Sequence, residues 1–206
     1  MVIIALTDLY RNGKEATKFR EYGFLVTTGV LGALFGFAND LITSTISPDY
    51  FTLGKGLDEG PDLQMRAGLY GLQVGFSAGI IGGGICLYLC RRKSAHPPAK
   101  ISRLFQLLWM PVAGAVLCGI LLPMALSPFD PAKFASQLAA ILDAARISRF
   151  RQVWWTHVGL YAGMIIGLMA MIYCASKGRV NIRLTNPPNP SESGKMTPPP
   201  TENEAE

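Results

Sequence analysis

Five polar side chains lie inside or at the edge of long apolar segments: Asn39, Asp40, Gln73, His157 and Tyr161. A carboxylate, an imidazole and a phenol at similar depth could bind a proton or a small ligand, because histidine titrates near neutral pH. Ionisable residues within a membrane span are costly unless they face a partner or water, so they are candidates for function. The five residues therefore form a candidate polar cluster.

Three interpretations of this cluster stay open. In the first, Asp40 and His157 pair in a small pocket that serves proton-linked transport or sensing. In the second, the polar groups form hydrogen bonds that hold the helices together. In the third, the Asp40 carboxylate extends to water at the membrane surface. The first interpretation fails if Asp40 and His157 point to different faces.

The sequence offers little material for catalysis, metals or cofactors. No arrangement of nucleophile and base can be argued from two histidines, so no catalytic residue is predicted. Cys86 and Cys90 lie one helical turn apart, but nothing nearby has ligand spacing, which favours packed or lipid-facing thiols over a metal site. A haem with two axial histidines is excluded, because His96 and His157 are expected on opposite sides of a membrane. We predict neither metal nor cofactor.

Four apolar segments must position the polar residues. Half of the 206 residues are hydrophobic and 16% are charged, against about 25% charged in a typical soluble domain. Each segment would extend roughly 31–35 Å as a helix, enough to cross a hydrocarbon core of about 30 Å. The sequence predicts an all-α integral membrane bundle of four transmembrane helices over 22–176, between a segment 1–21 and a disordered tail 177–206. The predicted spans are 22–42, 68–90, 104–126 and 153–175.

The distribution of Lys and Arg predicts the orientation of the bundle. Thirteen of the 19 basic residues lie in 1–21, in 91–103 or after 175, and six lie in the connections 43–67 and 127–152. The positive-inside rule then places both termini in the cytoplasm. The net charge of +5 is explained by basic residues on the cytoplasmic side, which are attracted to anionic lipid headgroups. We expect the lipid bilayer of the cell (inner) membrane as the partner, and no nucleic acid.

The two outer loops begin alike, with Ser-Pro at 47–48 and at 127–128. Serine before proline is typical of a helix N-cap, so we expect a short helical turn over 48–53. Gly54 would end it, and the aromatic pair at 50–51 would lie near the headgroups.

Apolar residues at steps of three and four predict an amphipathic helix over 131–151 in the second outer loop. It could lie on the membrane, cap the bundle or merge into the fourth span.

Glycines recur every four residues in the second span and again in the fourth. Small residues at this spacing let helices approach closely in lipid. We expect the second helix at the tightest contact, inside the monomer or across a homo-oligomer; a second membrane protein is a further possible partner. The packing positions are Gly71, Gly75, Gly79 and Gly83, then Gly159, Gly163 and Gly167.

The combination of Asn39-Asp40, ISPDYF at 46–51, Lys55-Gly56, His157 and Tyr161 resembles a group of bacterial four-span membrane proteins. The resemblance covers most of 20–175. It implies the architecture and a bacterial inner membrane, and supplies no reaction or catalytic residue. The expected function is a non-enzymatic membrane component that binds a partner or forms an assembly. The alternative is a small proton-linked transporter or sensor, and a membrane enzyme ranks third.

Overall fold

The computed structural model describes residues 17–91, 99–130 and 133–185, together with the isolated positions 7, 10, 11 and 13, and side chains as far as 177. Within these residues every regular element is a helix, so the predicted all-α class is confirmed. Most of 1–21 and the tail beyond 185 lie outside the described residues, whereas 177–185 continue the last helix. The helices are α2 (Thr17–Ile46), η2 (Tyr50–Gly54), α3 (Leu63–Arg91), α4 (Ile101–Leu107), α5 (Trp109–Leu126), α6 (Phe134–Leu138) and α7 (Ala144–Thr185).

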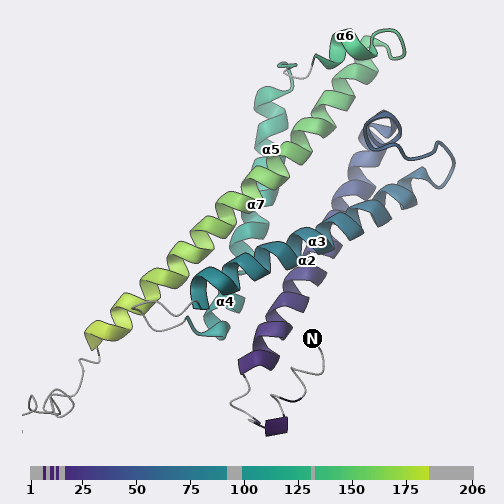
Figure 1. Cartoon of the computed structure of the whole chain (residues 1–206). Helices are drawn as coiled ribbons and strands as arrows, with labels where there is room; N and C mark the ends of the chain where they lie inside the picture. The colour runs from purple at the N-terminus through teal and green to yellow at the C-terminus, as the bar shows by residue number, and fades with distance from the viewer. Residues whose placement is uncertain are drawn as a thin grey trace, which may run out of the picture.

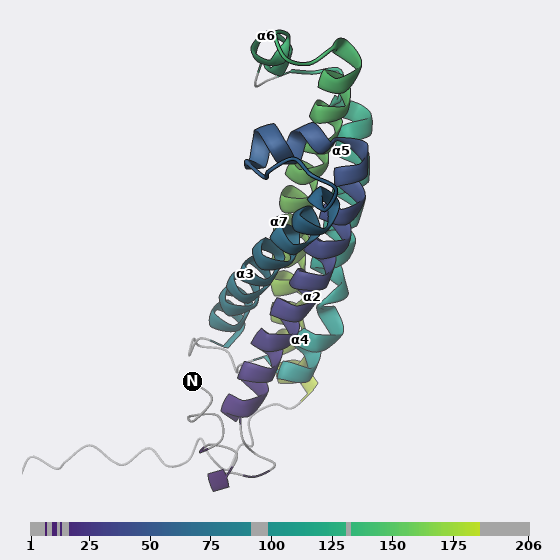
Figure 2. The ribbon, with the colours of Figure 1, turned by 90° about the vertical axis from the view of Figure 1, so that its right-hand side faces the viewer.

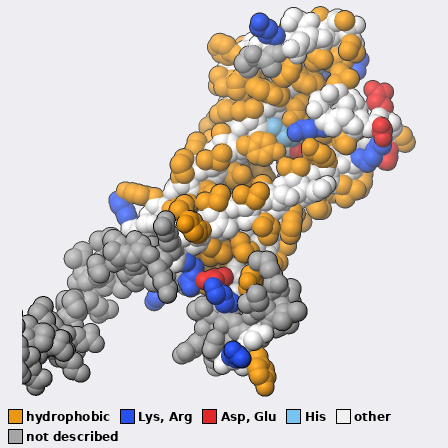
Figure 3. Space-filling view, viewed as in Figure 1, with side chains coloured by type: hydrophobic (Ala, Val, Ile, Leu, Met, Phe, Trp, Pro, Cys, Tyr) orange, Lys and Arg blue, Asp and Glu red, His pale blue; other side chains and the backbone are white. Residues whose placement is uncertain are grey.

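Four helical segments are long and apolar enough to cross a membrane: Lys18–Ile46, Leu63–Arg91, Ile101–Leu126 and Ala144–Lys177. On the face seen in Figure 3, hydrophobic side chains cover much of the length of the helices, and most charged side chains lie toward the two ends. Met124 is 75% exposed and Ile81 62% exposed. Apolar exposure on this scale would be unfavourable in water and is what a lipid-facing surface requires. The chain is a multi-pass membrane protein.

The long helices form two antiparallel hairpins, α2 with α3 and α5 with α7 (Figures 1 and 2). Glycines lie at both crossings. A Cβ on Gly75 would overlap the carbonyl oxygen of Gly32, and a Cβ on Gly163 would overlap that of Gly114. In lipid such close backbone approach supplies the van der Waals contact that holds helices together.

The two hairpins share a construction that extends to their sequences. The pattern G-L-x-x-G-x-x-x-G-x-x-x-x-x-x-C occurs at 71–86 in α3 and again at 159–174 in α7. In each hairpin the middle glycine of this pattern, Gly75 or Gly163, meets a glycine of the preceding helix. The two hairpins therefore share a glycine packing motif, and they meet each other across one interface.

The third long segment is interrupted where α4 meets α5. Proline at 111 has no N–H to donate to the carbonyl of Leu107, and its ring would crowd that carbonyl. The helix tightens instead, and the Leu108 N–H donates to the Phe105 carbonyl at 3.3 Å. This interruption separates α4 from the longer α5.

The turn after α2 is capped as its serine suggests. The Tyr50 N–H donates to Ser47 Oγ at 3.3 Å, and η2 follows. The element η2 ends at Gly54, and Lys55 is the last helical residue, so the turn runs slightly past the predicted range 48–53. Gly56 follows with a φ of +70°, which favours glycine, and the Leu57 N–H donates back to the Phe51 carbonyl at 3.0 Å.

The single amphipathic helix predicted over 131–151 is wrong, because the segment divides into α6 and the start of α7. The Asp130 carboxylate accepts the N–H groups of Phe134 at 2.7 Å and Ala135 at 2.6 Å. Asp143 Oδ1 accepts the Arg146 N–H at 2.8 Å, so Asp143 caps the start of α7. The apolar pattern had predicted an uninterrupted helix at this position. The short α6 packs on the loop end of the bundle, and 144–151 merge into α7.

The hairpins meet each other at both ends. At the end that holds α6, which we call the loop end, Phe51 and Phe150 belong to one buried cluster. At the opposite end Phe24, Leu104 and Met171 belong to another. Between the two clusters the hairpins contact each other little compared with the contact inside each hairpin. This arrangement leaves a cleft along the interface.

Candidate functional site

Asp40 on α2 and His157 on α7 meet inside the loop end of the bundle. His157 Nε2 lies 3.0 Å from Asp40 Oδ1, and the two residues are 6% and 5% exposed. A Cβ on Gly71 would overlap the Asp40 side chain, so this glycine leaves room for the carboxyl group. The burial of Asp40 rules out the interpretation in which its carboxylate extends to water. The pair links the first hairpin to the second.

The geometry of His157 requires a proton between the two side chains. His157 Nδ1 lies 2.9 Å from the carbonyl oxygen of Val153, which can only accept, so Nδ1 carries a hydrogen. Asn39 donates its amide N–H to Asp40 Oδ1 at 2.8 Å. The contact between Nε2 and Oδ1 then needs one more proton, either on the imidazole or on the carboxyl group. In both arrangements the pair as a whole is neutral.

This geometry predicts the tautomer of His157. The chain has two histidines, so the variant His96→Gln leaves one imidazole for ¹⁵N NMR of the histidine-labelled protein. We expect a protonated Nδ1 near neutral pH, because the Val153 carbonyl holds its hydrogen. A signal from an imidazole protonated at Nε2 alone would contradict the geometry. Denatured protein provides the reference spectrum.

The turn that contains η2 covers the imidazole. The Tyr50 ring stacks on His157 with 4.8 Å between centroids and 28° between planes, and the Phe51 ring meets it edge-on at 6.1 Å. Both aromatic residues are buried within the protein, and their position relative to the headgroups stays a prediction. Burial raises the pKa of Tyr50 far above its usual value, and nearby Tyr161 and Asp40 raise it further. The phenol is therefore neutral at physiological pH.

A salt bridge fastens this turn to the second hairpin. Arg146 Nε donates to Asp49 Oδ2 at 3.0 Å, and a second guanidinium nitrogen donates to Asp49 Oδ1. Two parallel bonds of this kind fix orientation as well as distance. This salt bridge was not predicted from the sequence. The opposite charges of Asp49 in the first outer loop and Arg146 in the second could have suggested it.

The structure brings together some of the predicted cluster and leaves out one member. Asn39 contacts Asp40, and its amide nitrogen lies 3.5 Å from His157 Nε2. Tyr161 lies one turn from His157, is 43% exposed and lines the cleft. Gln73 is exposed and does not line the cleft. Gln73 is the third residue of the glycine pattern in α3, as Tyr161 is in α7. Unlike Tyr161, it does not line the cleft.

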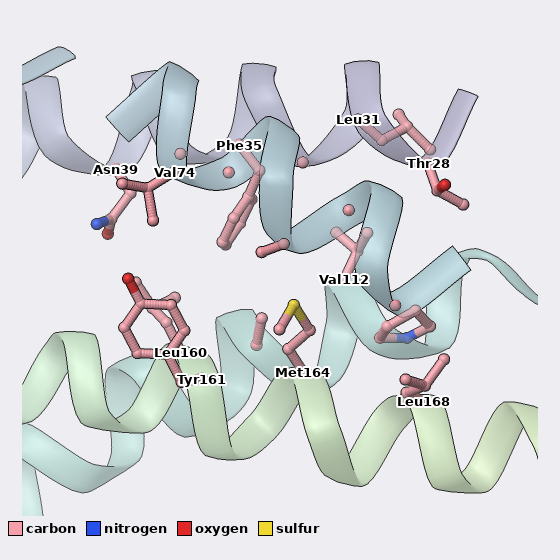
Figure 4. A pocket seen from close by; sticks show the side chains of 18 of the residues that line it. Thr28, Leu31, Phe35, Asn39, Val74, Val112, Leu160, Tyr161, Met164 and Leu168 are labelled. Atoms are coloured by element: carbon pink, nitrogen blue, oxygen red, sulfur yellow. The ribbon is translucent and has the colours of Figure 1, made fainter. Parts of the chain in front are cut away.

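The cleft between the hairpins has a volume of about 150 Å³ and runs from the Asp40–His157 pair toward the opposite end of the bundle. Figure 4 shows its two walls, with Asn39 and Tyr161 facing each other near one end and Phe35 and Met164 farther along. Its lining is almost entirely apolar along the middle. The polar cluster is therefore at one end of a narrow apolar channel.

Two further residues at the polar end of the cleft, Lys55 and Tyr70, were not predicted to belong to the site. Lys55 Nζ lies 5.5 Å from the centroid of the Tyr50 ring and 5.6 Å from that of Tyr70. Lys55 and Tyr70 also line the cleft. The resemblance included Lys55, but its position in the sequence gave no sign that it lies near His157. Lys55 comes close because the chain folds back through η2.

Fold and site together define a membrane protein of two glycine-packed hairpins joined by a buried carboxylate–imidazole pair. Among the described residues, no three His, Cys, Asp or Glu side chains gather as metal ligands would. Compared with known proteins, the chain matches no family model, no curated protein and no solved structure.

Proposed function

We propose that this protein is a proton-linked sensor or transporter of the bacterial inner membrane, and a non-enzymatic one. The observation that carries the proposal is the buried Asp40–His157 pair, because it joins the two hairpins through one proton. Such a pair is a two-state element: with the proton it is a neutral hydrogen bond, and without it the Nε2 lone pair faces a carboxylate. Histidine switches of this kind act near neutral pH.

The distribution of basic residues supports an orientation for this switch. With both termini in the cytoplasm, the loop end faces away from the cytoplasm. The pair then lies in the half of the bundle away from the cytoplasm, under the cover of η2. A site in this position would respond to protons from outside the cell. The pair lies at the interface between the two hairpins, and many transporters place their sites between two helical units in this way.

Other titratable groups surround the imidazole from each packed element. Asp40 comes from α2, Tyr50 from η2, Tyr70 from α3 and Tyr161 from α7, and Lys55 lies beyond Tyr50 in the same cleft. The raised pKa of Tyr50 keeps it neutral. The proposal therefore concerns the proton shared by Asp40 and His157.

The double variant Asp40→Asn with His157→Gln tests the proposal, because two amides can hydrogen-bond without a titrating proton. In the wild type we expect amide hydrogen exchange of 47–57, corrected for its intrinsic pH dependence, to rise at least about tenfold from about pH 6 to about pH 9. In the double variant we expect no rise. Exchange of 101–110 serves as the internal reference.

A wild-type protein whose exchange at 47–57 is independent of pH would contradict the proton-linked function. That result would favour the simpler role, in which the pair is hydrogen-bonding glue in a partner-binding or assembly-forming component. A double variant that keeps the full pH response would also contradict the proposal, since the response would then belong to another group.

A further inference from the structure

The cleft between the hairpins is a separate feature that the proton switch leaves unexplained. We infer that it binds a single-chain lipid with an anionic headgroup, the chain lying along the cleft and the headgroup at Lys55. This inference goes beyond the proposed function and does not depend on it.

The shape of the cleft favours one long chain. It is lined by His157 at one end and Met171 at the other, fourteen residues along α7 and so roughly 21 Å apart. That length exceeds half of a hydrocarbon core of about 30 Å. A volume of about 150 Å³ spread over this length is less than one hydrocarbon chain fills, so the cleft encloses only part of a single chain. The two chains of an ordinary phospholipid would not fit side by side.

The middle of the cleft offers contacts for methylene groups and little else. Phe35 comes from α2, Val74 from α3, Val112 from α5 and Met164 from α7, so all four long helices contribute. Figure 4 shows these side chains directed into the space between the two walls. Burial of hydrocarbon against such a surface gives no headgroup specificity, which must come from the polar end.

The polar end carries donors without acceptors. Within the described part of the chain, Lys55 makes no salt bridge and contacts aromatic rings instead. The hydroxyl groups of Tyr70 and Tyr161 make no hydrogen bond there either. Because the Asp40–His157 pair is neutral as a whole, Lys55 leaves this end with a net positive charge. A carboxylate or phosphate monoester at the end of the chain would complement it.

Binding of oleate, compared with oleyl alcohol, tests the inference on the full-length protein in phosphatidylcholine nanodiscs. The two probes share the chain and differ in the headgroup. By native mass spectrometry and thermal stabilisation, we expect the wild type to bind oleate at least about tenfold more tightly than the alcohol. We expect Lys55→Met to bind both equally. The matched control Lys100→Met, at the opposite end, should keep the wild-type preference.

A bulkier side chain in the channel tests the position of the chain. We expect Val112→Phe to weaken both probes at least about tenfold, because the ring would occupy the narrow space. Equal binding of the two probes to the wild type, or a preference for oleate that survives Lys55→Met, would overturn the inference. If Val112→Phe does not fold, the comparison of oleate with oleyl alcohol in the wild type and in Lys55→Met still tests the inference.

Discussion

Replacing Gly75 with alanine is expected to destabilise the folded protein by about 1–3 kcal/mol, the typical cost of forcing a methyl group into a packed contact. The added Cβ would overlap the backbone carbonyl of Gly32 on α2. Backbone cannot rotate away as a flexible side chain can. The two helices of the first hairpin would have to separate and lose their close contact, which in lipid is a main source of helix association.

The same substitution at Gly84 is the matched control. This glycine lies in the same helix, and a Cβ built there meets nothing within 4 Å. We expect Gly84→Ala to leave stability unchanged or to raise it slightly, because alanine favours helix over glycine. The measurement is the midpoint of unfolding by SDS in mixed micelles. Equal midpoints for the two variants would contradict the packing role of Gly75.

Replacing His157 with leucine is expected to cost about 3–5 kcal/mol of stability, because Asp40 would remain buried without its partner. The double variant Asp40→Leu with His157→Leu should recover most of that loss, since two apolar side chains of moderate size leave no charge to bury. The same reasoning predicts a large loss for Asp40→Leu alone. This cycle measures the coupling across the hairpin interface.

Tyr161→Phe supplies the control for this cycle. Tyr161 lies one turn from His157 and lines the same cleft, but its hydroxyl makes no hydrogen bond to any described residue. We expect a change below about 0.5 kcal/mol, as for a partly exposed group without a partner. If the double leucine variant were as unstable as the sum of the single variants, the pair would not be coupled.

The predicted helix ends were reliable where a cap was recognised in the local sequence and failed where the apolar period was followed past a cap. Ser47 caps its turn through its own side chain, so four adjacent residues were enough to predict it. The turn predicted over 48–53 runs slightly longer, because it includes a π-helical segment that ends at Gly54 and one more helical residue, Lys55. The division of 131–151 at Asp143 followed from a cap that the apolar period does not reveal.

The candidate site shows the same limit. Residues on one helix, such as His157 and Tyr161, were assigned to a shared face from their spacing alone. Gln73 was grouped with the pair by its depth in the sequence but does not line the cleft, because rotation about the helix axis follows from the neighbours and not from counting residues. Asp49, Tyr50 and Lys55 approach the site only because the chain folds back after α2.

The sequence by itself determined that this chain is a bundle of four membrane-length helices with close glycine contacts, since length, hydropathy and residue spacing act along one helix at a time. Tertiary structure alone decided that two such hairpins meet at their ends and stay apart in the middle. It also decided that Asp40 on the first hairpin bonds to His157 on the second. The physical reason is that a hydrogen bond between distant segments depends on the rotation and offset of both helices, which only the packing of the whole bundle fixes.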